Sequence, residues 1–129
     1  MSDAEDIDDI REQKKEELMA RAGTPDEPVH IDSGAHLEEV LEDNHVVLVD
    51  FYADWCGPCK MLEPTVEEIA AETDAAVAKV DIDALQSLAQ EYQVQGVPTL
   101  YLFVDGETAD RMVGVQDKPT LVQKIEAHA

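Results

Sequence analysis

The feature that most constrains the fold is the stretch 46–60, VVLVDFYADWCGPCK. Its first seven residues are apolar at nearly every position, so both faces of the strand that they predict must be covered. Strands of this kind lie in the middle of a sheet with helices on both sides. A short turn follows, and then a helix with Cys56 and Cys59 in its first turn. The stretch therefore predicts a layered α/β domain with a cysteine pair at a strand-to-helix junction.

The residues on either side of this stretch predict the other elements. Helical spacing of apolar residues indicates four helices. The first is capped by Asp32 or Ser33 and has Leu37, Val40 and Leu41 facing inward, and the second runs from Cys59 to at least Ala70 with Pro64 as an internal kink. A short one covers about 85–92, and the last begins at Lys118-Pro119. The further predicted strands are 29–31 at an edge, 76–81, 99–104 and 108–115, the last two joined by a hairpin turn at Asp105-Gly106. Gly114 within the last strand indicates a bulge or a close backbone approach.

The N-terminal residues differ from the remainder in composition. Residues 1–22 carry many charges of both signs and only a thin apolar stripe, and the linker-like GTPDEP follows at 23–28. We interpret 1–28 as a solvated, partly helical or disordered extension, with a docking arm as the alternative, and 29–129 as a single domain. The N-terminus lacks the features of a signal peptide and no apolar run approaches the roughly 20 residues of a membrane span, so we expect a cytoplasmic protein.

The net charge excludes several classes of partner. With 30 acidic against 9 basic residues the formal charge is −21, which repels nucleic acids and anionic membranes. Disorder would also explain such a charge, but 44% hydrophobic residues and regular patterning after residue 28 argue against it. We favour adaptation to a high-salt cytoplasm, where screening relieves the self-repulsion of an acidic surface.

The two cysteines allow three interpretations. At positions i and i+3 of a helix start they lie one turn apart on one face, close enough for a disulfide. A metal site would need further ligands, and the 4 histidines show no ligand spacing relative to the cysteines. A purely structural disulfide closing so short a loop would stabilise the fold little. A redox dithiol is the interpretation that we favour.

The helix start assigns different roles to the two sulfurs. Its partial positive charge and free N–H groups stabilise a thiolate, which makes Cys56 the nucleophile. Cys59, one turn further in, is expected to be less exposed and to resolve the mixed disulfide. Gly57 lets a substrate backbone approach, and Pro58 fixes the backbone at the helix start.

Two charged residues stand out because they interrupt apolar strands. Asp50 should be desolvated with a raised pKa, and it could accept the proton of Cys59; the alternative is a structural aspartate that caps a helix. Lys79 is its candidate charge partner, or else an edge lysine reaching toward water. Trp55, the single tryptophan, could form a contact surface beside the nucleophile or belong to the core.

Together these segments resemble the thioredoxin family. The resemblance rests on WCGPCK preceded by VDFYAD, Pro64 in the following helix, VAKVDID, GVPTL, FVDGE and Gly114, in matching order over about residues 29–129. It is far more specific than an isolated CxxC. Tyr52 departs from it, standing where many members have tryptophan. The fold implied is α/β, a mixed five-stranded sheet flanked by four helices, here with an N-terminal extension.

The resemblance also implies roles for residues and partners. Cys56 would attack, Cys59 resolve, Asp50 serve as the buried carboxylate and Lys79 as its partner. Pro98 would be a cis-proline facing the disulfide, and the Val97 backbone would pair with an extended substrate. The docking surface would include Trp55, Gly96 and Gly114, beside Gly57 and Pro58.

The function that follows is protein-disulfide reduction. We expect a monomer that reduces disulfides in target proteins, is re-reduced by a thioredoxin reductase, and uses no cofactor or metal beyond its own Cys56–Cys59 pair. A thiol oxidase or isomerase of the same fold is the first alternative, although Gly-Pro between the cysteines favours the reductant by resemblance. A non-catalytic binding subunit is the second, and the intact CxxC with Asp50 argues against it.

Overall fold

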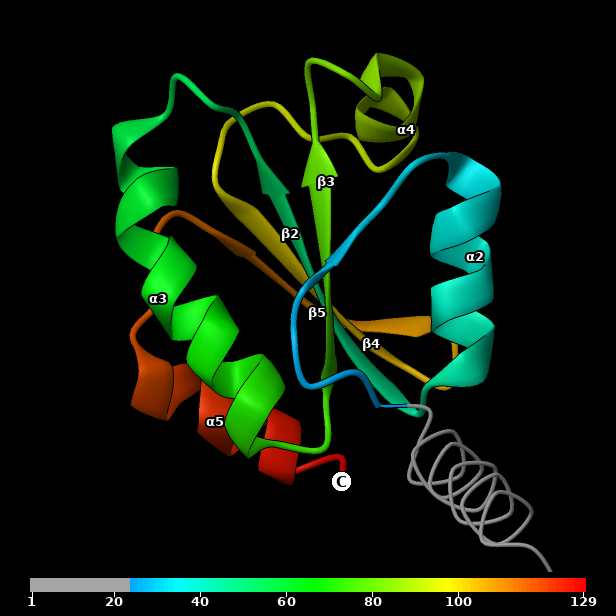
Figure 1. Ribbon diagram of the computed structural model, residues 1–129, viewed down its shortest axis with the longest axis vertical. Coiled ribbons are helices and arrows are strands. Elements are labelled where there is room, and N and C mark those ends of the chain that lie inside the picture. Colours follow the sequence, from blue (N-terminus) through cyan, green and yellow to red (C-terminus); the bar gives the residue numbers. More distant parts are fainter. Residues whose placement is uncertain (1–23) are drawn as a thin grey trace, which may run out of the picture.

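A computed structural model describes residues 24–129 of the chain. Within that range five strands and four helices follow one another in the order expected (Figure 1). Their bounds are β1 Val29–His30, α2 Gly34–Asp43, β2 Val46–Tyr52, α3 Gly57–Glu72, β3 Ala76–Asp81, α4 Gln86–Glu91, β4 Thr99–Val104, β5 Glu107–Val113 and α5 Lys118–Glu126. Residues 1–23, and with them most of the predicted N-terminal extension, lie outside the described range, so the division into extension and domain stays a prediction.

The described strands form one mixed sheet with the order β1-β3-β2-β4-β5. β3 runs parallel to both β1 and β2, whereas β2–β4 and β4–β5 are antiparallel pairs. β2 is therefore the central strand, and five of its first six residues are buried apolar side chains. This confirms the expectation drawn from its apolar sequence, and β1 confirms the expected edge strand.

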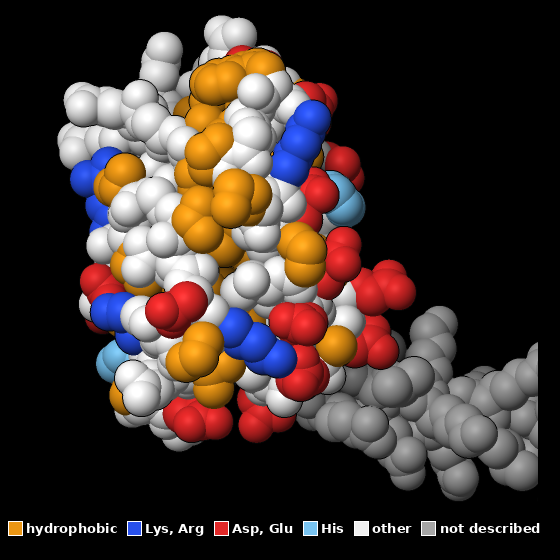
Figure 2. Space-filling view, turned by 90° about the vertical axis from the view of Figure 1, so that its left-hand side faces the viewer, with side chains coloured by type: hydrophobic (Ala, Val, Ile, Leu, Met, Phe, Trp, Pro, Cys, Tyr) orange, Lys and Arg blue, Asp and Glu red, His pale blue; other side chains and the backbone are white. Residues whose placement is uncertain are grey.

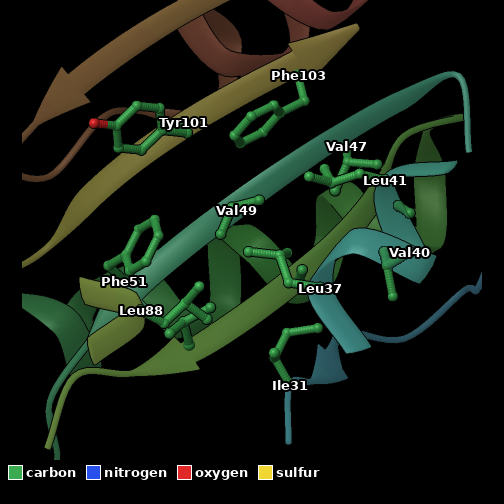
Figure 3. Packing of buried hydrophobic residues seen from close by; sticks show 13 residues of the cluster. Ile31, Leu37, Val40, Leu41, Val47, Val49, Phe51, Leu88, Tyr101 and Phe103 are labelled. Atoms are coloured by element: carbon green, nitrogen blue, oxygen red, sulfur yellow. The ribbon is translucent and has the colours of Figure 1, made fainter. Parts of the chain in front are cut away.

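Helices cover both faces of the sheet (Figure 1). On one face α2 and Leu88 of α4 pack on Val47, Val49 and Phe51 of β2, with Tyr101 on the neighbouring strand (Figure 3). On the other face α3 and α5 pack on the alternate residues of the same strands, in a cluster that includes Val46, Leu48, Leu100, Leu102 and Met112. Because side chains alternate along a strand, even-numbered residues of β2 face α3. Asp50 is even-numbered and so faces the helix that carries the cysteines.

The helices begin where their sequences indicate. The side chain of Ser33 caps α2 by accepting the N–H of His36 at 3.1 Å, one of the two caps proposed there. Asp117 caps α5 in the same way, accepting the N–H of Thr120 at 2.9 Å. α3 continues through Pro64 as one helix of 16 residues, so the proline does not divide it.

The β4–β5 hairpin agrees with the sequence at its turn and differs at its end. Asp105 and Gly106 both have positive φ, 53° and 82°, as the favoured two-residue hairpin turn requires. β5 ends at Val113, earlier than expected, and the sheet irregularity lies at Leu102/Phe103. Gly114 therefore follows the strand and does not form a bulge within it; its φ of 93° is a conformation that glycine adopts without strain.

Candidate active site

The two cysteines lie at the junction of β2 and α3 and are joined as a disulfide, with their Cα atoms 5.2 Å apart. Cys56 is the N-cap residue of α3, and its Sγ accepts the N–H of Cys59 at 3.2 Å. The N–H of Cys56 in turn donates to the carbonyl oxygen of Ala53 at 3.2 Å. A sulfur held at a helix N-terminus by a backbone donor is in the environment that stabilises a thiolate.

The two sulfur-bearing residues do not differ in exposure. Cys56 and Cys59 are each 3% exposed, and both pack in a small cluster with Ala53, bordered by Tyr52 and Val97. The expectation that Cys59 would be the less exposed of the two is therefore wrong for this disulfide form. Their difference lies in position, because only Cys56 stands at the cap of the helix and accepts one of its free N–H groups.

A second loop faces the disulfide. The Val97-Pro98 peptide bond is cis, as the family resemblance implied, and the Cys56 Sγ lies 3.6 Å from the carbonyl oxygen of Val97. The carbonyl oxygen of Pro98 accepts the N–H of Gly114 at 2.8 Å, and that of Gly96 accepts the Thr99 hydroxyl. The structure thus brings the helix start, the 96–98 loop and the residue after β5 together at one place.

Exposed apolar side chains accompany these segments. Trp55 is 69% exposed and Met61 72%, and Val113 and Val115 are also exposed, so Trp55 is a surface residue and not part of the core. The indole Nε1–H of Trp55 donates to Asp83 at 2.9 Å, which fixes the ring beside the helix start. Figure 2 looks onto the side of the molecule on which α3 lies and shows a band of apolar side chains there, with acidic side chains beside it.

Asp50 is fully buried in the central strand. Within residues 24–129 neither of its carboxylate oxygens has a hydrogen-bond partner, so the helix-capping alternative is wrong. Desolvation by burial raises the pKa of Asp50 to about 6; Lys79 acts against this rise and Glu63 adds to it. A carboxyl group with this pKa is half-ionised at about pH 6 and mostly ionised at pH 7, so it can accept a proton near neutral pH and binds it more tightly than an ordinary aspartate does.

Lys79 lies beside Asp50 on the neighbouring strand, where the two are register partners. Its side chain is only 7% exposed and β3 lies between β1 and β2, so Lys79 is a buried lysine of an inner strand and not an edge lysine. The ammonium donates to Glu63 Oε1 at 3.3 Å and lies 4.4 Å from the ring centre of Tyr52. Lys79 therefore acts on Asp50 by charge, while its hydrogen bond goes to a residue that the sequence analysis did not select.

Glu63 and Asp83 are the neighbours of the site that the sequence analysis missed. Glu63 follows Cys59 by four positions on α3, a spacing that places both on one side of the helix and was available as a signal. Asp83 lies in the loop after β3 and gives no such signal. His45 lies at the opposite end of β2, where its ring binds Asp105 and the His128 carbonyl.

Comparison with known proteins places this geometry in a family. The thioredoxin family model matches residues 27–127. The chain belongs to the thioredoxin family. Thioredoxin of Mycobacterium tuberculosis is 44% identical over 99 residues, which cover 75% of this chain and 85% of that protein. A solved structure of a mutant thioredoxin from Halobacterium salinarum is 56% identical with a TM-score of 0.79, covering 81% of this chain and 93% of that one.

Membership of this family makes the chain a thiol–disulfide oxidoreductase with Cys56 and Cys59 as its redox pair. A longer relative, named bifunctional thioredoxin reductase/thioredoxin from Mycobacterium leprae, is 41% identical over 99 residues, which cover 75% of this chain and 22% of that protein. Among residues 24–129 no helix is long and apolar enough to cross a membrane.

Proposed function

We propose that Cys56 attacks disulfides of target proteins and that Cys59 resolves the resulting mixed disulfide. The observation that carries this assignment is the position of Cys56 at the N-cap of α3, with its sulfur facing the 96–98 loop. The Cys56 thiolate forms a bond to one substrate sulfur, and the other leaves as a thiolate that takes up a proton. The Cys59 thiolate then attacks Cys56 Sγ, which closes the disulfide of this chain and releases the substrate with both sulfurs reduced. Two electrons pass from the dithiol to the substrate.

The substrate chain docks, in this proposal, along the surface around the disulfide. A Cβ added at Gly57, Gly96 or Gly114 would meet nothing within 4 Å, so the space beside these glycines is open; at Gly114 the positive φ also favours glycine. Their bare backbone leaves room for an approaching peptide. An extended substrate would pair with the backbone of Val97 beside cis-Pro98 and rest on the exposed ring of Trp55.

The electron donor is, in this proposal, a thioredoxin reductase. The Mycobacterium leprae relative, whose name joins the two activities in one protein, supports this pairing. We further propose that the chain works as a cytoplasmic monomer that needs no metal or organic cofactor.

The test of the proposed function is reduction of insulin disulfides with dithiothreitol as the electron source. We expect the wild-type chain to accelerate the reaction and a variant with both cysteines replaced by serine to leave it at the uncatalysed rate. Equal acceleration by both proteins would contradict the proposal. The reduction potential of the Cys56–Cys59 pair, measured against glutathione, then separates a reductant from an oxidase of the same fold.

Asp50 is, in this proposal, the proton acceptor for Cys59. We expect Asp50→Asn to slow insulin reduction at least about tenfold near pH 7, because a positioned base typically contributes that much or more. The deficit should shrink toward pH 9, where Cys59 ionises without help. Rates measured from pH 6 to pH 9 test this, and a pH profile identical to that of the wild-type chain would leave Asp50 without a role in proton transfer.

The acidic surface is proposed to adapt the chain to high salt. With a formal charge of −21, the folded chain repels itself, and salt screens this repulsion. We expect the free energy of unfolding to rise by at least about 1 kcal/mol between 0.1 M and 2 M KCl at pH 7. The same comparison near pH 4, where many carboxylates are protonated, is the control. A salt effect as large at pH 4 as at pH 7 would show that screening is not its cause.

A further inference from the structure

A row of polar residues crosses the sheet on the face that α3 covers. His30 of β1 is the register partner of Lys79 of β3, which is in turn the register partner of Asp50 of β2. Register partners in neighbouring strands project from the same face of a sheet. The row therefore leads from the exposed edge strand inward to the buried carboxyl group, with Lys79 in the middle.

The Lys79 ammonium interacts unequally with its two neighbouring carboxylates, Glu63 on α3 and Asp50 on β2. Its ammonium forms a hydrogen-bonded ion pair with Glu63 at 3.3 Å, whereas within residues 24–129 neither oxygen of Asp50 accepts a hydrogen bond. Glu63 is half-exposed and Lys79 is buried. A cation held toward one carboxylate stabilises the ionised form of another less than it would if it were free to bind it.

A pocket opens to solvent at this ion pair. It has a volume of about 460 Å³. Its lining residues are Asp26, Glu27, Pro28, His30, Glu63, Glu67 and Lys79. Glu63 and Lys79 therefore both line this acidic opening, and their ion pair forms part of its wall. Glu67 lines the same pocket one helical turn further along α3, but the ion pair of Lys79 among the described residues is with Glu63.

We propose that Glu63 is a positioning residue for thiol–disulfide exchange: by binding the Lys79 ammonium at the pocket, it sets how strongly Lys79 stabilises ionised Asp50, and so the pH at which Cys59 loses its proton. This inference rests on the proposed role of Asp50 as the acceptor of that proton. Glu63 acts on the sulfurs only indirectly, through the Lys79–Asp50 pair.

The direction of the effect follows from the charges that surround Asp50. Lys79 lowers the pKa of Asp50, and Glu63 raises it both by its own negative charge and by holding the ammonium. Neutralising Glu63 should therefore lower the pKa of Asp50, whereas neutralising Lys79 should raise it. The other titratable groups near this row are Tyr52 on β2, Asp54 in the loop after it, Asp81 on β3, His30 on β1, Glu67 on α3, and Asp26 and Glu27 before β1. A substitution at Glu63 leaves all of these in place.

The experiment compares Glu63→Gln with Glu67→Gln in the full-length chain. Both variants remove one negative charge from the same helix and the same pocket, but only the first removes the partner of Lys79. The carboxyl carbon of Asp50 is followed by NMR as a function of pH in ¹³C-aspartate-labelled, oxidised protein, assigned with Asp50→Asn. We expect Glu63→Gln to lower the pKa of Asp50 by about half a pH unit or more, and Glu67→Gln to change it much less.

Kinetics supply the second measurement. The pH profile of insulin reduction should move to lower pH in Glu63→Gln by a similar amount and stay in place in Glu67→Gln. In an Asp50→Asn background Glu63→Gln should cause no further movement, because the group through which it acts is gone. Equal titration of Asp50 in the two glutamine variants would overturn the proposal, and so would a movement of the profile that persists without Asp50.

The two measurements keep this proposal distinct from the one on which it rests. If Asp50 had no part in proton transfer, the pH profile of Asp50→Asn would match that of the wild-type chain, whatever the NMR titration showed. If Glu63 did not control the Lys79–Asp50 pair, the pH profile of Asp50→Asn would still differ from that of the wild-type chain. The pKa of Asp50 measured in Glu63→Gln would then equal the wild-type value. Either result overturns the proposed action of Glu63 on exchange and shows which of its two steps fails.

Discussion

A Cys59→Ser variant should capture target proteins as mixed disulfides through Cys56, and Cys56→Ser should capture none. The attacking sulfur is still present in the first variant, but the group that releases it is missing. Serine does not replace a thiolate as a nucleophile at neutral pH, so both variants should lose catalytic turnover by roughly three orders of magnitude. The difference between them lies in the trapped intermediate and not in the rate.

Mass spectrometry after incubation with insulin measures this difference directly. We expect an adduct on Cys59→Ser that dithiothreitol removes, and a peptide map that places it on residue 56. The variant with both cysteines replaced is the control for non-specific association. An adduct on Cys56→Ser with none on Cys59→Ser would reverse the two roles, and adducts of equal yield on both would show that the helix start does not select the nucleophile.

The main features of the fold could be predicted because its signals are local. A strand that is apolar on both faces, as in β2, requires cover on both sides, and Asp105-Gly106 specifies a tight turn by the conformations that it permits. The end of β5 could not be placed because Gly114 is compatible with either a bulge or a residue beyond the strand. Contacts between strands decide that choice, and in the structure the irregularity lies at Leu102/Phe103.

The residues of the site that give a local signal in the sequence could also be predicted. Cys56 and Cys59 were identified from their position at a helix start, and Asp50 and Lys79 because each interrupts an apolar strand. The partner of Lys79 was not identified: Glu63 shares one side of its helix with Cys59, but this spacing alone does not show which of the chain's 30 acidic residues meets the ammonium. Only the packing of α3 on β3 shows that Glu63, rather than its many equivalents, meets the buried ammonium at 3.3 Å.

Burial of Asp50 should also make the oxidised protein less stable as pH rises. The pKa of this carboxyl is about 6 in the folded chain against an ordinary value of 3.8, so between these values the folded state binds more protons than the unfolded state. The contribution of protonated Asp50 to the free energy of unfolding is fully present below about pH 3.8. It falls as the pH rises from 3.8 to about 6 and changes no further above that pH. A difference of this size corresponds to about 3 kcal/mol at pH 7.

Asp50→Asn isolates this contribution, because asparagine has nearly the same shape and does not ionise. The other acidic residues titrate in both proteins, so their effects cancel in the difference between the two free energies of unfolding. We expect the stability of Asp50→Asn relative to the wild-type chain to increase by about 2 kcal/mol between pH 4 and pH 7, measured by denaturant unfolding of the oxidised proteins at constant ionic strength. A difference that stays constant across this range would mean that Asp50 ionises as easily in the folded chain as in the unfolded one. That result would remove the physical basis for its action as a base near neutral pH, because an ordinary aspartate binds a thiol proton too weakly to serve.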